Sequence, residues 1–271
     1  MAGRRRDSLN QFDLCSIQSS MERPTLIILP GWGGTKETWR DFTELAKDFF
    51  EVQVIDLPCF GEEPCPPKVW GIEEYSTFVK SKILNHKPAR HGLARGMAGG
   101  SKIILLGHSF GGQVAANFAA QNPEMISKLI LIAPALFRKK RGLRRLFFGI
   151  IAKTGHLIFK LPIIEKFDVW AKKVLYKAAD SPDYAETSGI KREIFKKIIR
   201  QDLTNILPKI TVPTLLIQGT IDKYVPVKDS KKAIDLIPDA KLELIPLARH
   251  GLHFQQPKKL LSVITQYALG D

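Results

Sequence analysis

The sequence contains little cysteine, and its thiols form no CxxC pair. Cys15, Cys59 and Cys65 are an odd number, which argues against a disulfide framework or a cysteine zinc site. Each is most simply a free thiol, although Cys59 and Cys65 lie close enough in the sequence for a bond. The 6 histidines are scattered without the spacing of metal ligands, so no metal site is expected.

Long apolar runs are also absent. No stretch reaches the roughly 18 to 20 consecutive apolar residues that a membrane-spanning helix needs. Residues 1–20 contain Arg4, Arg5 and Arg6, but no apolar run follows them as it would in a signal peptide. The same residues are polar and aperiodic, which predicts a disordered tail over 1–20. A cytoplasmic location is expected.

Acidic residues are fewer than basic ones. The 271 residues include 27 Asp and Glu against 41 Lys and Arg, a net charge of +14. Residues 136–210 alone hold 18 basic and 7 acidic side chains, which accounts for +11 of that excess. The apolar share of 44% is that of a globular chain with a full core, which excludes collagen, a coiled-coil rod and general disorder.

The apolar pattern alternates between strand and helix along most of the chain. The expected strands are Thr25 to Leu29, Val52 to Leu57, Lys102 to Gly107, Lys128 to Ala133, Thr214 to Gln218 and Leu242 to Ile245. The expected helices are Glu37 to Phe49, Ile72 to Leu84, Ser109 to Gln121, Pro226 to Ile237 and Pro257 to Leu269. Because the strands are nearly all apolar, the pattern predicts an α/β fold whose mostly parallel sheet of about six strands has helices on both faces.

The basic segment interrupts this alternation. Apolar residues recur at helical spacing from Leu143 to Ile151 and again from Ile190 to Ile199. The sequence therefore predicts a core of residues 21–135 and 211–271, with a basic helical cap inserted at 136–210.

The strongest chemical motif is GxSxG at Gly107–Gly111, between an expected strand and an expected helix. Small residues around Ser109 would relieve crowding in a sharp turn that exposes its hydroxyl. A strand, a turn and a helix around this motif are typical of a nucleophile elbow.

From residue 24 to its end the chain resembles the α/β-hydrolase superfamily. That superfamily orders its catalytic triad as nucleophile, acid and histidine. The motif GTIDKYVP resembles the segment that carries the acid, which implies Asp222. His250 precedes Pro257 by seven residues, as the superfamily's base does, so it is preferred over His253. Arg249 departs from the glycine that is usual before that histidine.

The resemblance extends to an oxyanion hole in the loop after the first strand. Pro30-Gly31-Trp32-Gly33-Gly34 is similar to the superfamily's HG-containing loop, with proline in place of histidine. It implies that the backbone N–H groups of Trp32 and Phe110 stabilise the oxyanion. This chemistry requires no cofactor and no metal.

The cap would cover an apolar acyl site. The expected substrate-binding side chains are the aromatic residues Phe137, Phe147, Phe148, Trp170 and Phe195. Its basic residues are either a solvated face or a surface that attracts an anionic membrane or an acidic carrier protein. Nucleic acid is not expected, because no recognition motif accompanies the charge.

The implied activity is that of a serine hydrolase that cleaves a small-molecule ester with an apolar acyl group. A lactonase, for example of acyl-homoserine lactones, and an acyl-carrier-protein methyl ester esterase remain open, the latter because the Gly31–Gly33 loop and basic cap are similar to those of pimeloyl carrier-protein methyl ester esterases. From a different class, a non-catalytic ligand-binding protein with the same fold also remains open.

Overall fold

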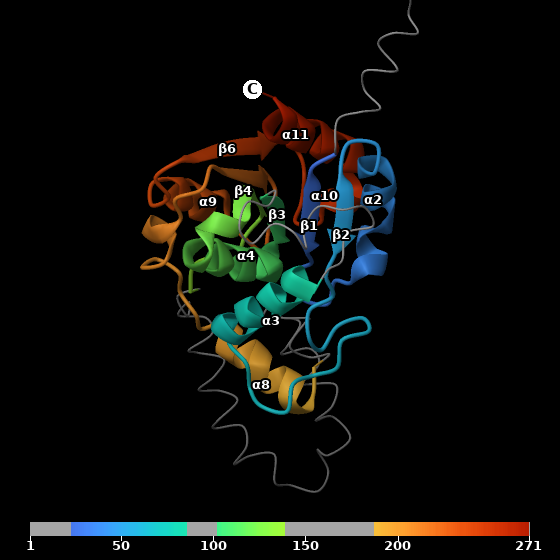
Figure 1. Cartoon of the computed structure of the whole chain (residues 1–271). Coiled ribbons are helices and arrows are strands. Elements are labelled where there is room, and N and C mark those ends of the chain that lie inside the picture. Colours follow the sequence, from blue (N-terminus) through green and yellow to red (C-terminus); the bar gives the residue numbers. More distant parts are fainter. Residues whose placement is uncertain (1–22, 86–101, 139–186, 271) are drawn as a thin grey trace, which may run out of the picture.

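A computed structural model describes residues 23–85, 102–138 and 187–270 (Figure 1). Its sheet has six strands, all parallel, in the order β2-β1-β3-β4-β5-β6. The strands are β1 (Thr25–Leu29), β2 (Glu51–Val54), β3 (Ile103–His108), β4 (Ile126–Ile132), β5 (Thr214–Gly219) and β6 (Ala240–Ile245). The expected parallel sheet is confirmed, with strand ends shifted by a few residues.

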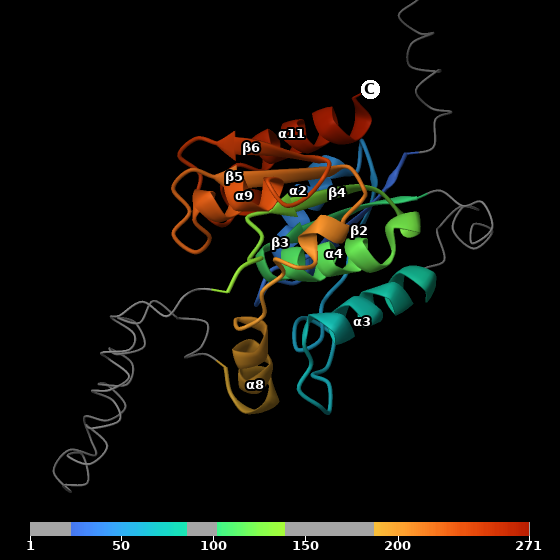
Figure 2. The ribbon, with the colours of Figure 1, turned by 90° about the vertical axis from the view of Figure 1, so that its left-hand side faces the viewer.

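Helices cover both faces of the sheet (Figure 2). One face carries α3 (Ile72–Asn85), α4 (Ser109–Gln121) and α9 (Val227–Ile234), and buried residues of α8 (Gly189–Ile198) join the same core from beside α3. The other carries α2 (Arg40–Ala46), α10 (Leu252–Gln255) and α11 (Pro257–Leu269). Each face of the sheet has its own hydrophobic core, here called the first core on the side of α4 and the second core on the side of α11. Along β1, Ile27 and Leu29 belong to the first core and Leu26 and Ile28 to the second, and all four are fully buried. The strand is all apolar because both of its faces are covered.

Three short 3₁₀ turns complete the described elements: η1 (Lys36–Trp39), η2 (Pro123–Met125) and η3 (Leu207–Lys209). The single helix expected over Glu37 to Phe49 is divided into η1 and α2. The turn α10 was not expected from the sequence. None of the helices in the described ranges is long and apolar enough to cross a membrane.

The direction in which the chain adds strands reverses between β1 and β3. From β1 the chain moves to one side of the sheet to form β2 and then returns past β1 to form β3. Ligands in open α/β sheets bind outside the carboxyl ends of the strands at such a reversal. The loop after β1 and the first turn of α4 both meet there.

Only part of the expected cap lies within the described residues. Its second apolar stripe forms α8, beside α3 in both views, where Ile194 and Ile198 are buried in the first core (Figures 1 and 2). Gln201 accepts the N–H of Ile72, and Lys197 pairs with Glu74 at 3.6 Å. Phe147, Phe148, Trp170 and the tail 1–20 lie outside the described residues, so the cap and tail boundaries remain predictions.

The free-thiol interpretation of two cysteines is wrong. Cys59 and Cys65 form a disulfide bond in the loop that follows β2. The backbone N–H of Cys59 also bonds to Glu63 O at 3.1 Å, so the loop turns back on itself and brings the two thiols together. Disulfides persist mainly in oxidising compartments. This bond therefore argues against a cytoplasmic location, which remains an untested prediction.

Candidate functional site

Ser109 is held in a strained turn between β3 and α4. Its φ of 51° lies in the left-handed region, which is uncommon for a residue other than glycine. A Cβ on Gly107 would lie 2.5 Å from Gly111 O, and a Cβ on Gly111 would overlap the carbonyl oxygens of Leu29 and Pro30. Both positions therefore require glycine, and α4 can begin directly against β1. The turn has the geometry of a nucleophile elbow.

Asp222 follows β5, and its side chain is fully buried. Its Oδ1 accepts the backbone N–H groups of Tyr224 at 2.7 Å and Val225 at 3.0 Å. Its Oδ2 lies 2.7 Å from Nδ1 of His250 and accepts the Nε2 amide of Gln218 at 3.1 Å. Four donors thus converge on the carboxylate and fix its orientation.

The same contacts keep Asp222 ionised. Burial acts to raise the pKa of the carboxyl group, but the hydrogen bond and charge of His250, together with the N–H groups of Val225 and Tyr224, lower its pKa below the ordinary value. A charged carboxylate can only accept hydrogen bonds, so Nδ1 of His250 must donate to it. In its neutral form His250 then has a lone pair on Nε2.

Gln218 joins the carboxylate to the core. It is a fully buried polar residue that follows three apolar residues of β5, Leu215 to Ile217. Its amide nitrogen also donates to Val225 O at 3.1 Å, and its Oε1 accepts the hydroxyl of Ser230 at 2.8 Å. The amide therefore ties the loop that carries Asp222 to β5 and to α9.

His108 connects Ser109 to His250. Its ring centroid lies 4.8 Å from that of His250, and its Nε2 lies 3.0 Å from His250 O. Burial and the neighbouring His250 and His253 lower the pKa of His108 well below its ordinary value, so its ring is neutral. Because a carbonyl only accepts, the proton is on Nε2. The residue before the nucleophile thus anchors the backbone of the candidate base.

The hydroxyl of Ser109 has no hydrogen-bond partner among the described residues, including His250. Hydrogen bonds between nucleophile and base are often long until substrate binds. The structure joins Asp222 to His250 directly and joins Ser109 to His250 through His108.

His253 is placed differently from His250. It is buried and stacked on Trp39, with ring centroids 4.2 Å apart and planes 3° from parallel. Its Nδ1 has no partner among the residues described, and burial and His250 lower its pKa to about 4. These contacts are those of a packing residue, and they favour His250 as the base.

Replacing His253 with phenylalanine should keep activity and reduce acid sensitivity. The pKa of His253 is depressed from 6.5 to about 4, so the unfolded chain takes up a proton as the pH falls through this window and the folded chain does not. Stability present above pH 6.5 is therefore lost toward pH 4, with a slope of about 1.4 kcal/mol per pH unit from this group. Urea unfolding of His253→Phe between pH 6.5 and 4 should show a correspondingly shallower loss.

The matched control is His250→Phe, which should remove turnover. If His253→Phe were inactive while His250→Phe kept wild-type turnover, the assignment of the base would be reversed.

The loop after β1 lies against the elbow. A Cβ on Gly31 would be 3.3 Å from Cβ of Ser109 and 2.8 Å from Nδ1 of His108. The turn is closed by the N–H of Gly34 on Gly31 O at 3.0 Å, so the N–H of Trp32 is not used by it. The N–H of Phe110, in the first turn of α4, has no partner within its helix. These two donors are available for an oxyanion.

Aromatic side chains surround Trp32. Its ring centroid lies 4.9 Å from Phe60, 5.6 Å from Phe110 and 4.8 Å from Phe195 of α8. Phe195 is therefore next to the candidate oxyanion loop. Phe137 instead has Lys232 Nζ 3.9 Å from its ring centroid, beside α9. Contact of either with substrate remains a prediction.

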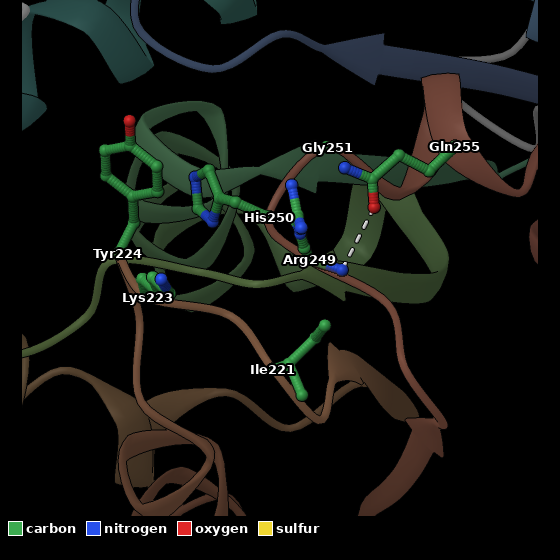
Figure 3. Close-up of a pocket in the computed structure, with 7 residues that line it drawn as sticks. All are labelled: Ile221, Lys223, Tyr224, Arg249, His250, Gly251 and Gln255. Carbon is green, nitrogen blue, oxygen red and sulfur yellow. Dashed lines mark hydrogen bonds between the residues drawn. The ribbon is translucent and has the colours of Figure 1, made fainter.

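A cavity of about 300 Å³ borders His250 (Figure 3). Its lining comes from the loops after β5 and β6 and from α10: Ile221, Lys223, Tyr224, Arg249, His250, Gly251 and Gln255. The ring of Tyr224 is 5.1 Å from that of His250. Gln255 Oε1 accepts the backbone N–H of Arg249 at 3.0 Å, the dashed line in Figure 3.

Comparison with known proteins identifies the family. The family model described as serine aminopeptidase, S33 (Hydrolase_4) matches residues 21–257, most of the chain. The chain belongs to this family of hydrolases. The expected membership of the α/β-hydrolase superfamily is thereby confirmed.

Curated relatives of this hydrolase match at low identity over nearly their whole length. The pimeloyl-[acyl-carrier protein] methyl ester esterase of Vibrio vulnificus (strain YJ016) is 22% identical over 267 residues, covering 93% of this chain and 96% of that one. The uncharacterized hydrolase YugF of Bacillus subtilis (strain 168) is 25% identical, covering 90% of each chain.

Solved structures agree in fold. A bacterial membrane phospholipase A has a TM-score of 0.65 at 22% identity, over 92% of this chain and 79% of that chain. A thermophilic esterase from Thermogutta terrifontis has a TM-score of 0.63 at 23% identity, over 92% and 90% of the two chains. At these identities the likeness establishes the fold of the hydrolase and not its substrate.

Several residues of the site were not assigned from the sequence: Gln218, His108, Tyr224 and the basic pair Lys223 and Arg249. A polar residue in an apolar strand was the signal for Gln218, and the departure from glycine was the signal for Arg249. No group of three or more metal-ligating side chains occurs among the described residues.

Proposed function

We propose that this hydrolase cleaves carboxylic esters through an acyl-enzyme on Ser109. The observation that carries the proposal is the 2.7 Å contact between Asp222 and Nδ1 of His250, together with a glycine-flanked elbow at Ser109 whose neighbour His108 has its ring 4.8 Å from that of His250. This contact selects the imidazole tautomer in which Nε2 can accept a proton. The order serine, aspartate, histidine along the chain is that of the superfamily.

In the first half of the reaction, Oγ of Ser109 attacks the carbonyl carbon and its proton passes to Nε2 of His250. Asp222 stabilises the imidazolium that forms, and the N–H groups of Trp32 and Phe110 donate to the oxyanion. The tetrahedral intermediate then expels the alcohol, which takes the proton from Nε2.

In the second half, water attacks the acyl carbon of the acyl-Ser109 ester and gives its proton to the same nitrogen. Collapse releases the carboxylic acid and returns the proton to Oγ. His250 is thus neutral again at the end of each half of the reaction, and no step requires a cofactor.

The relatives' names favour ester substrates and keep two finer possibilities open. A carrier-protein methyl ester is supported by the Vibrio vulnificus relative and by the +11 excess of residues 136–210, most of which lie outside the described ranges. A lactone uses the same chemistry. Binding of the basic segment to an anionic membrane is a separate proposal that liposome binding at low and high salt tests.

Release of p-nitrophenol from acetate, butyrate, octanoate and palmitate esters tests the activity. A panel of homoserine lactones and an aminoacyl p-nitroanilide, which follows the family's name, should accompany it. We expect turnover of at least one ester chain length above the non-enzymatic rate. Cleavage of the anilide alone would overturn the ester assignment, and inactivity on the panel and on a carrier-protein methyl ester would favour a non-catalytic binding protein.

A further inference from the structure

We propose that the cavity beside His250 binds an anionic group carried by the alcohol portion of the substrate. The inference rests on the proposed ester hydrolysis and names its substrate class: an ester whose alcohol bears a carboxylate or a phosphate. The two residues that would recognise the anion are Lys223 and Arg249.

The cavity is lined by hydrogen-bond donors and contains no acid. Lys223 and Arg249 are its two cations, and neither side chain has an ion-pair or hydrogen-bond partner among the described residues. The Tyr224 hydroxyl is a third possible donor. Gln255 accepts the backbone N–H of Arg249 with its Oε1, so its amide NH₂ is free to act as a fourth donor. Carboxylate and phosphate oxygens are the acceptors that such a lining suits.

Neither cation is required by the local fold. The loop that carries Arg249 is held by its backbone N–H on Gln255, by Gly219 packed against the carbonyls of Ala248 and Arg249, and by the N–H of Ile221 on Ala248 O. The Arg249 side chain takes no part in these contacts, and in Figure 3 it extends between His250 and Gln255. Lys223 is exposed and likewise free of described partners.

The position of the cavity assigns the anion to the alcohol side. Nδ1 of His250 is occupied by Asp222, so Nε2 must protonate the departing alcohol. That oxygen therefore lies within hydrogen-bond reach of Nε2 of His250, a residue that itself lines the cavity. At about 300 Å³, the cavity is at the small end of the range for ligand sites.

The test uses three esters of one acid, chosen as the best acyl chain of the ester panel. Their alcohols are 4-hydroxybenzoate, 4-hydroxyphenyl phosphate and the uncharged 4-hydroxybenzamide. Wild type should prefer at least one anionic ester by about tenfold in kcat/KM, through a lower KM, as two partly exposed ion pairs would give. The preference should fall at high salt, because exposed charges are screened.

The double variant Lys223→Ala/Arg249→Ala should lose the preference, so that its kcat/KM is the same for the charged esters and for the benzamide ester. Arg249→Lys should keep most of it. The double variant Lys241→Ala/Lys258→Ala removes two exposed lysines outside the cavity and controls for the same loss of net charge. Equal kcat/KM for charged and neutral esters, or a preference that survives in the double variant, would overturn the proposal.

Calorimetric binding of the free alcohols separates this inference from the proposed function, because it needs no turnover. 4-Hydroxybenzoate or the phosphate should bind wild type more tightly than 4-hydroxybenzamide, and the double variant should not discriminate. If the protein discriminated between the alcohols but hydrolysed no ester, the anion site would be supported and the esterase assignment contradicted. If it hydrolysed esters but did not discriminate, the esterase assignment would be supported and the anion site contradicted.

Discussion

Replacing Ser109 with alanine is expected to lower ester turnover by about 10⁴-fold or more. The loss arises because no other described hydroxyl occupies the elbow, where a φ of 51° presents the side chain of residue 109 beside the loop of Trp32. Alanine keeps the Cβ and the backbone of this turn. The proposed oxyanion donors and the Asp222–His250 pair therefore remain in place, and only the proposed attacking atom is removed. Steady-state kinetics on the best ester of the panel would measure the effect.

The fold of the variant should be unchanged, and a thermal unfolding curve that superimposes on that of the wild type is the control. A fluorophosphonate, which forms a covalent bond with an activated serine, should label the wild type and not Ser109→Ala. Turnover that persists in the variant, or labelling of another residue, would show that the nucleophile lies elsewhere.

The strands of this hydrolase could be predicted because their sequence is uniform. A parallel strand covered on both faces must be apolar at nearly every position, so β1, β3 and β4 stand out as apolar runs. Ser109 and the helix after it follow from the glycines that the tight turn requires. The strand order could not be predicted in this way, because it depends on contacts between distant segments.

The parts that escaped prediction are set by tertiary contacts. Cys59 and Cys65 are brought together by the turn of their loop, which their spacing alone does not require. His108 has a role only because the backbone of His250, 142 residues later, ends beside it. The cavity beside His250 combines three segments, so the basic residues in it carry no sequence signal other than the unusual Arg249.

Replacing Asp222 with asparagine is expected to lower kcat by about 10³- to 10⁴-fold, because the amide cannot satisfy this site in either orientation. All four groups around the carboxylate are donors: two backbone N–H groups on Oδ1, and Nδ1 of His250 with the amide of Gln218 on Oδ2. An NH₂ in place of Oδ2 would face the amide donor of Gln218, so neither group could accept a hydrogen bond from the other. It would also donate to Nδ1 of His250, which moves the imidazole proton to Nε2 and prevents that nitrogen from accepting the serine proton. An NH₂ in place of Oδ1 would face the backbone N–H donors of Tyr224 and Val225, which would then have no acceptor.

The accompanying loss of stability should be about 1 to 3 kcal/mol, the typical cost of a buried group left without a partner. Gln218→Met separates the two effects, because it removes one donor from Oδ2 and leaves the carboxylate charge and the His250 contact. We expect this variant to lose stability and to keep more kcat than Asp222→Asn does. Kinetics and urea unfolding of both variants would measure this difference. Wild-type kcat in Asp222→Asn would mean that His250 is oriented by another group and that the 2.7 Å contact has no catalytic role.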